Sequence, residues 1–155
     1  MNREMQIIRE VNIEAENFYK DAIELGDHAA HVLTRAHRSQ MTGLENIADT
    51  ALKTSDILDY IKRQTTRFSY WQKSFPKPGQ PTTSFGERLK DYLEKNLRER
   101  RDVLCSDKRL GISDKTYEDR YLRLHVYLLL IRQFIRQMVV QYEYRVTFPE
   151  DKKGA

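Results

Sequence analysis

Apolar residues in the last third of the chain recur with the period of a helix. They are spaced alternately four and three residues apart, which places them along one face of a single helix. This stripe consists of Tyr117, Tyr121, Leu124, Leu128, Ile131, Ile135, Met138 and Tyr142. Other apolar residues, among them Leu122, Val126 and Val140, widen the face beyond a two-stranded seam. The pattern predicts a long helix over residues 113–146, capped by Ser113, at the centre of a bundle.

The same period, over shorter stretches, predicts helices in the first half of the chain. The first covers residues 3–25 and ends at Gly26, because glycine is favoured just beyond the last turn of a helix. Its apolar positions are Met5, Ile8, Ile13, Phe18 and Leu25. A second helical stretch covers residues 27–39. Thr42, with a glutamate three residues later, forms a capping box that predicts a new helix start. Residues 44–73 then form either one bent helix or two.

The clearest interruption of the helical pattern is residues 75–81, which hold three of the four prolines. This stretch predicts a surface loop and a candidate hinge. Ser84 and Glu87 form a second capping box, and the helix that they open extends to about Leu104. Another proline lies in residues 147–155, which we predict to be a flexible C-terminal tail.

The composition agrees with a helical protein. The chain has 155 residues, enough for one hydrophobic core, and only six glycines. Nine tyrosines, six phenylalanines and one tryptophan argue against disorder. We therefore predict an all-α fold: a single-domain bundle of about five helices over residues 1–146, with a long C-terminal helix.

Cysteine usage and apolar runs bear on localisation. Cys105 stands alone, so the chain cannot form an internal disulfide, which fits the reducing cytoplasm. The first residues lead directly into charged helical sequence, without the pattern of a signal peptide. The apolar run over residues 126–131 is far shorter than the roughly 20 residues that cross a bilayer. We therefore expect a cytoplasmic protein that has no membrane partner.

Charge is unevenly distributed along the chain. The net charge is +4, but residues 1–50 carry −4, residues 51–101 carry +6 and residues 102–155 carry +2. A basic middle behind an acidic start predicts one surface that faces a polyanion and another that is free for protein partners. The alternative is an ordinary solvated helical surface.

The basic residues of the middle and last segments are the candidate nucleic-acid-binding residues. If their helices pack as neighbours, these side chains line one groove, and affinity for a polyanion grows with each phosphate that is neutralised. The set is Lys62, Arg63, Arg67, Lys73, Arg88, Lys90, Lys95, Arg98, Arg100, Arg101, Arg132 and Arg136. Phe68, Tyr70 and Trp71 lie among them and would stack unpaired bases if exposed. The alternative places Phe68 and Trp71 in the core.

Metal and cofactor chemistry find little support in the sequence. Glu24, Asp27, His28 and His31 have spacings that could converge on a metal ion, but the expected helix end at Gly26 spoils the geometry. There is no glycine-rich phosphate loop, no zinc-binding Cys/His spacing and no nucleophile elbow. We expect neither a metal nor a cofactor, and no enzymatic activity.

One short motif supports a different interpretation. Arg120, four intervening residues and His125 on a late helix resemble the motif of the HEPN ribonuclease superfamily, although Tyr121 replaces the small polar residue usual there. The resemblance implies that the arginine and the histidine would act on an RNA phosphate, usually across a dimer, without a metal.

The chain as a whole resembles the small subunit of type I CRISPR surveillance complexes of the Cascade type. That subunit is similar to the C-terminal helical domain of the large subunit. The resemblance rests on length, helix content, basic surface and the look of residues 58–63 and 131–136. It implies a non-catalytic subunit that stacks with copies of itself and other subunits, and holds guide RNA and a target or displaced single DNA strand by the backbone. A scaffold that binds only protein is a third possibility.

Overall fold

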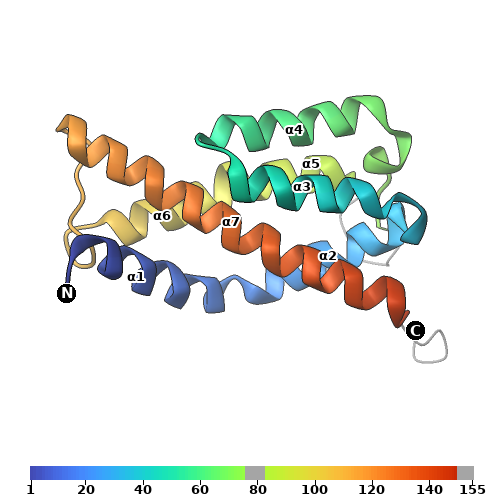
Figure 1. The fold of residues 1–155 in the computed structure, drawn as a ribbon, viewed down its shortest axis with the longest axis horizontal. Helices are drawn as coiled ribbons and strands as arrows, with labels where there is room; N and C mark the ends of the chain where they lie inside the picture. Colours follow the sequence, from blue (N-terminus) through green and yellow to red (C-terminus); the bar gives the residue numbers. More distant parts are fainter. Residues whose placement is uncertain (76–82, 150–155) are drawn as a thin grey trace.

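Helices form nearly all of the chain in the computed structural model, which describes residues 1–75 and 83–149 (Figure 1). The fold is an all-α single domain, as predicted. The α-helices are α1 (Arg3–Asn17), α2 (Tyr19–Leu33), α3 (Arg38–Thr50), α4 (Thr54–Arg67), α5 (Phe85–Asp91), α6 (Leu97–Cys105) and α7 (Tyr117–Thr147). The shorter segments are the 3-10 helices η1 (Arg35–His37) and η2 (Ser69–Gln72) and the π-helix η3 (Tyr92–Asn96).

The long helix α7 organises the bundle. It runs diagonally across the molecule and makes its most extensive contact with α2, with further contacts to α3, α6 and α1 (Figure 1). The second part of the predicted stripe is buried, namely Leu128, Ile131, Ile135, Met138 and Tyr142. Tyr117, Tyr121 and Leu124 are exposed instead, and the last two border a surface hollow beside the segment that links α3 to α4. Periodicity therefore predicts the helix but not the length over which other helices cover it.

The start of α7 differs from the prediction. Thr116, not Ser113, is the N-cap, and its side-chain oxygen accepts a hydrogen bond from the backbone N–H of Asp119 at 3.1 Å. Ser113 lies in the preceding turn and donates from its backbone and its hydroxyl to the Asp119 carboxylate. That interaction lowers the pKa of Asp119, because hydrogen bonds favour the charged carboxylate.

The first predicted helix is two helices, and its break lies earlier than predicted. The chain bends at Phe18, whose side chain is fully buried and packs edge-on against Phe134 with ring centroids 5.6 Å apart. Gly26 does not end a helix but lies buried inside α2. A Cβ atom at Gly26 would lie 2.6 Å from Gln141 Cβ and 2.7 Å from the Met138 carbonyl oxygen. The glycine therefore allows α2 to approach α7 closely.

The next predicted start is also displaced. Thr42 is not a cap but lies within α3, where its hydroxyl donates to the Arg38 carbonyl of the preceding turn. The chain turns earlier, at Thr34, which adopts a left-handed φ of 56° after α2. Residues 44–73 resolve into two helices, because the extended backbone at Ala51 and Lys53 separates α3 from α4.

The helix predicted from Ser84 is confirmed. The Ser84 side-chain oxygen accepts a hydrogen bond from the Glu87 backbone N–H at 3.3 Å, and α5, η3 and α6 continue as one rod. The wider π turn of η3 is stabilised from outside, because the Tyr127 hydroxyl donates to the Leu93 carbonyl at 2.8 Å.

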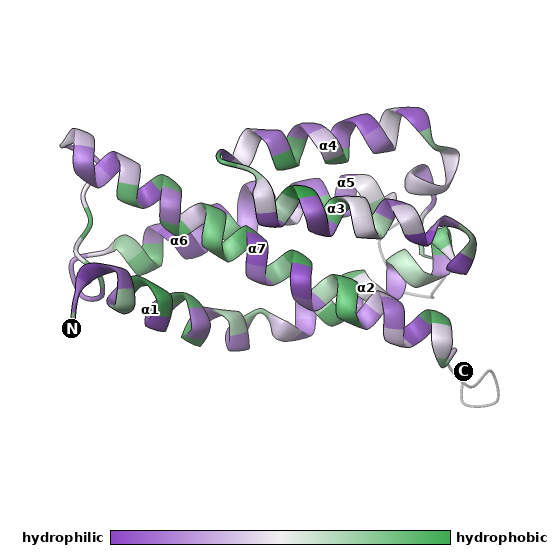
Figure 2. Cartoon of the chain, in the orientation of Figure 1, coloured by the Kyte–Doolittle hydropathy of each residue, from purple (hydrophilic) through white to green (hydrophobic). Residues whose placement is uncertain are grey.

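Two predicted features fall mostly beyond what the structure describes. Residues 76–82 of the proline-rich loop and residues 150–155 of the predicted tail lie outside the described residues, while α7 itself continues to Thr147. Hydrophilic and hydrophobic residues are mixed along the helices that are drawn (Figure 2). In keeping with this, no described helix combines the length and apolarity that crossing a bilayer requires.

Candidate nucleic-acid interface

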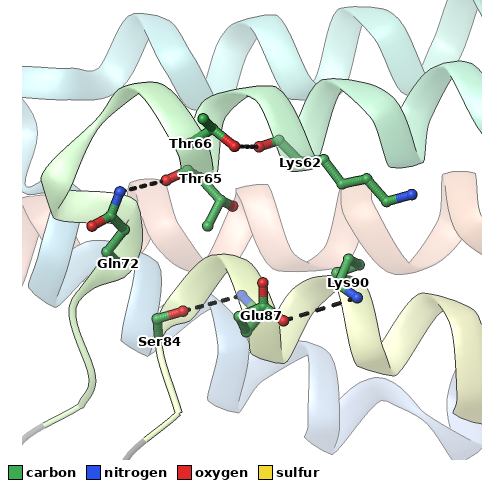
Figure 3. Close-up of a pocket in the computed structure, with 7 residues that line it drawn as sticks. All are labelled: Lys62, Thr65, Thr66, Gln72, Ser84, Glu87 and Lys90. Carbon is green, nitrogen blue, oxygen red and sulfur yellow. Dashed lines mark hydrogen bonds and ion pairs between the residues drawn. The ribbon is translucent and has the colours of Figure 1, made fainter.

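A groove between α4 and α5 brings together two of the predicted basic residues (Figure 3). It has a volume of about 610 Å³, and its wall is made by Lys62, Thr65, Thr66, Gln72, Ser84, Glu87 and Lys90. Lys62 comes from α4 and Lys90 from α5. The other members are mostly hydroxyl and amide side chains, which the sequence did not predict as binding residues. This groove is the part of the molecule that best matches the predicted basic trough.

The close approach of α4 and α5 depends on a small residue. Gly86 lies at the start of α5 against Thr65, and a Cβ at this glycine would collide with the Thr65 hydroxyl. The Thr65 hydroxyl itself donates to the Ile61 carbonyl at 2.7 Å within α4. Gln72 then ties the following segment to α4, since its side-chain amide donates to the Thr65 carbonyl at 2.8 Å. The walls of the groove are thus held by local hydrogen bonds.

The two lysines differ in how strongly carboxylates neutralise them. Lys62 is exposed and forms no ion pair within the described residues. The Lys90 Nζ lies 3.9 Å from a Glu87 carboxylate oxygen and 3.7 Å from one of Asp91. The Lys90 side chain is 23% exposed and the two carboxylates are 51% and 40% exposed, and partly exposed pairs at such distances are weak and screened by salt. Both ammonium groups are therefore available to an anion that enters the groove.

Five further predicted cations are exposed without a carboxylate partner among the described residues. They are Arg63, Arg67, Lys73, Lys95 and Arg98. Arg98 nevertheless has an aromatic neighbour, because its guanidinium carbon lies 5.9 Å from the centre of the Tyr127 ring. The exposed cations on α4, one residue and five residues beyond Lys62, project about 100° and 140° away from it around that helix, so they lie beside the groove and not in its wall.

Arginines on α6 that were predicted to contact phosphates contact protein instead. Arg100 Nη1 lies 2.9 Å from the Glu14 carboxylate, which is almost completely buried. Arg109 holds the other oxygen of that carboxylate at 3.1 Å. Arg101 pairs with the neighbouring Asp102 at 3.0 Å and lies 5.3 Å from the centre of the Tyr127 ring. Arg100 and Arg101 therefore support the packing of α6.

Arginines on α7 have similar structural roles. Arg132 donates to the carbonyls of Ala48 at 2.7 Å and Ala51 at 2.9 Å, which satisfies the C-terminal end of α3. Arg136 pairs with Asp49 of α3 at 3.3 Å. The structure does not bring these two arginines into the groove between α4 and α5.

Arg88 is half-buried and contacts a fully buried histidine. Its Nη1 lies 2.8 Å from His28 Nδ1, while His28 Nε2 lies 3.0 Å from the Lys73 carbonyl. Since the carbonyl can only accept, Nε2 carries the proton and Nδ1 accepts from Arg88. Burial lowers the pKa of Arg88, and burial first, then the arginine and His31, lower the pKa of His28 to about 4.

The aromatic residues divide between core and rim. Trp71 is fully buried and its indole N–H donates to Gln40 at 2.6 Å, so it takes the core alternative. Phe68 and Tyr70 are half-buried and pack on the core. The Tyr70 ring stacks on His37 with centroids 3.8 Å apart. We therefore assign no base-stacking role to Phe68, Tyr70 or Trp71.

The histidine and carboxylate group near Gly26 is used for packing. Asp27 accepts from Gln141 at 2.7 Å and from Arg145 at 3.1 Å, which ties α2 to the end of α7. His28 is engaged with Arg88 as described above. A search of residues 1–75 and 83–149 finds no cluster of histidine, cysteine and carboxylate side chains placed to hold a metal.

The ribonuclease-like pair is separated on α7. Arg120 donates to the Thr116 carbonyl within its own helix, and His125 lies 3.0 Å from a Glu4 carboxylate oxygen on α1. Five residues apart, the two side chains project about 140° from one another around a helix. Within one chain they do not converge, so the HEPN interpretation remains a prediction that needs a second copy.

Comparison with known proteins identifies no relative: no family model, no curated protein and no solved structure matches this chain.

Proposed function

We propose that this protein is a non-enzymatic nucleic-acid-binding subunit that holds the phosphate backbone of a single strand in the groove between α4 and α5. The observation that supports this most directly is the pairing of Lys62 and Lys90 across that groove. Backbone binding needs positive charge and hydrogen-bond donors in a trough, and no reactive group. Five of the twelve predicted cations serve protein contacts instead, so the proposed contact set is smaller than the sequence suggested.

The charge around the groove supports the same choice of ligand. Arg63 and Arg67 lie on α4 with no carboxylate partner among the described residues, and Glu87 is the one acidic residue in the wall of the groove. Arg63 and Arg67 lie about 100° and 140° around α4 from Lys62, so a strand held in the groove would reach them where it crosses the outer side of that helix. We further propose that the protein works as one subunit of an RNA-guided CRISPR-type assembly, in the role that its resemblance to the small subunit implies.

The test is binding of a fluorescent 20-nucleotide single-stranded DNA, measured by anisotropy over a range of salt concentrations. The variant Lys62→Gln/Lys90→Gln should bind about five- to tenfold more weakly at low salt, because it loses two phosphate contacts. The slope of log affinity against log salt should decrease by about 1.4, since each contact to a single strand contributes roughly 0.7.

A matched control separates the groove from net charge. Lys20→Gln/Lys115→Gln removes the same charge from exposed positions outside the groove and should change affinity less than about twofold. Equal losses in the two variants would contradict a specific groove. No binding by the wild-type protein, even at low salt, would instead favour a scaffold. Metal-independent cleavage of labelled RNA that is lost in His125→Ala would replace the proposal with the ribonuclease.

A further inference from the structure

The outer face of α1 carries apolar side chains that the fold leaves in solvent. Met1, Met5, Ile8 and Ile13 are 70%, 55%, 45% and 49% exposed. They border a shallow groove of about 540 Å³, which is completed by Arg9, Asn12 and Glu16. A contiguous apolar patch of this kind on a protein surface commonly marks an interaction site.

The fold itself does not need these side chains. The opposite face of α1, with Ile7, Val11 and Ala15, is buried against the rest of the bundle and anchors the helix. Three of the five apolar positions from which the first helix is predicted, Met5, Ile8 and Ile13, are exposed. α1 is thus apolar on two faces, and the bundle covers one of them.

The charges on this face are complementary to each other but too far apart to meet within one helix. Arg9 and Glu16 are both exposed, and neither has an ion-pair partner in the part of the chain that the structure describes. They lie seven residues apart, which places them near the same line of the helix and about 10 Å apart along its axis. The face therefore presents one positive and one negative end.

We infer that a second copy of this chain docks on the outer face of α1, with the two α1 helices antiparallel about a two-fold axis beside Asn12 and Ile13. In this arrangement Arg9 of each copy lies opposite Glu16 of the other, because the axis falls midway between them. The two ion pairs form at once. Ile13 lies between them and Ile8 lies one residue outside them, so these two apolar side chains of each copy become covered, while Met1 and Met5 lie towards the ends of the interface. A two-fold interface uses the same patch on both copies, and this face meets that requirement.

The size of the patch sets the expected strength. A stable interface buries about 800 Å² on each partner, which is more than one face of a helix of this length offers. We therefore expect a reversible dimer whose population rises with protein concentration. The interface does not include Lys62 or Lys90, so it can fail without affecting the proposed strand binding, and the reverse also holds.

The experiment is a charge reversal, with self-association measured by sedimentation equilibrium up to about 100 µM protein. The wild-type mass should rise towards twice that of one chain. In Arg9→Glu, a glutamate at position 9 of each copy faces Glu16 of the other. This repulsion at both contacts should weaken the dimer about tenfold or more. Arg9→Glu/Glu16→Arg exchanges the two charges and should restore association to within about threefold of wild type.

The controls keep the result interpretable. Arg63→Glu makes the same change of charge at an exposed, unpaired position on α4 and should leave the dimer unchanged. At protein concentrations low enough for every variant to be monomeric, thermal unfolding should be the same in all of them, because neither Arg9 nor Glu16 has an intramolecular ion pair to lose among the described residues. A monomer at every concentration would overturn the inference. So would a dimer that Arg9→Glu does not weaken, or one that the double reversal does not restore.

Discussion

At the scale of single residues, the main lesson concerns buried ionisable groups. Arg100 and Glu14 are 86 residues apart in sequence, yet their side chains meet at 2.9 Å. The carboxylate is 1% exposed, so removal of the arginine would leave a buried charge with one partner fewer, which is strongly destabilising. An arginine that faces a phosphate and one that neutralises such a carboxylate look alike in sequence. Pairing over this distance is set by the tertiary fold alone.

His28 should make the stability of the protein depend on pH. Its pKa is about 4 in the folded protein, against an ordinary value of 6.5, so the unfolded chain binds more protons between these values. The free energy of unfolding should therefore fall as the pH decreases from 6.5 to 4. The full contribution of this histidine is about 3 kcal/mol. A proton on Nδ1 would also face the Arg88 guanidinium, donor against donor.

Urea unfolding at several pH values tests this expectation. His28→Gln keeps a donor and an acceptor but cannot titrate, so its stability should vary less between pH 6.5 and 4 than that of wild type. His31→Gln, an exposed neighbour one turn away, serves as the control and should lose only a small part of the wild-type dependence, because His31 contributes least to the lowered pKa of His28. Parallel curves for wild type and His28→Gln would show that this histidine is not the cause.

At the scale of helices, the spacing of apolar residues predicted which segments are helical, but several helix ends lie elsewhere than predicted. Thr42 with Glu45 and Ser84 with Glu87 are equivalent capping boxes in sequence, yet only Ser84 begins a helix. The difference lies in the surroundings, since the chain had already turned at Thr34 and α3 was under way. The sequence predicts a helix end at Gly26 because glycine is favoured just beyond the last turn of a helix. Its real role depends on a contact with α7, more than a hundred residues later.

Gly26→Ala should destabilise the protein although alanine is the better helix former. The propensity gain is about 1 kcal/mol, but a Cβ 2.6 Å from Gln141 Cβ and 2.7 Å from a backbone oxygen forces α2 away from α7. Overpacking of this kind costs about 1–3 kcal/mol, so we expect a net loss of stability and a lower Tm. Gly43→Ala is the matched comparison.

The comparison is informative because the atom that a Cβ at Gly43 would approach can move more easily than those at Gly26. A Cβ at Gly43 would approach the hydroxyl tip of Tyr60, which is the far end of a side chain and can move. We expect Gly43→Ala to cost clearly less than Gly26→Ala in thermal and urea unfolding. A Gly26→Ala protein as stable as wild type would show that α2 and α7 can separate without loss, contrary to the close approach described here.

At the scale of the whole molecule, the two proposed surfaces lie at different edges of the bundle. α1 runs along one edge and α4 along the opposite one, with α7 between them (Figure 1). The uneven charge along the sequence likewise predicted one surface for a polyanion and another for protein partners, and this division of roles stays a prediction. Which residues line the groove could not be predicted from the sequence, because that depends on which helix packs beside which.

Separate surfaces lead to a dependence on strand length, which rests on both proposals together. A dimer joined through α1 presents two α4–α5 grooves, so a strand long enough to reach both gains avidity, whereas a short strand occupies one. At protein concentrations above the Kd of the dimer, the wild-type protein should bind a 40-nucleotide strand at least about tenfold more tightly than a 12-nucleotide strand. Ile8→Ser should reduce this ratio, because it removes an exposed apolar contact of the dimer without a change of charge.

The short strand serves as the internal control in this experiment. Its affinity should stay within about twofold of wild type in Ile8→Ser, since one groove remains intact in each chain. If Ile8→Ser weakened the short and the long strand by the same factor, the α1 face would itself contact the strand, and the two surfaces would not be separate. If the ratio stayed at the wild-type value while the variant sedimented as a monomer, the long strand would owe its affinity to one chain, and cooperation between two grooves would be excluded.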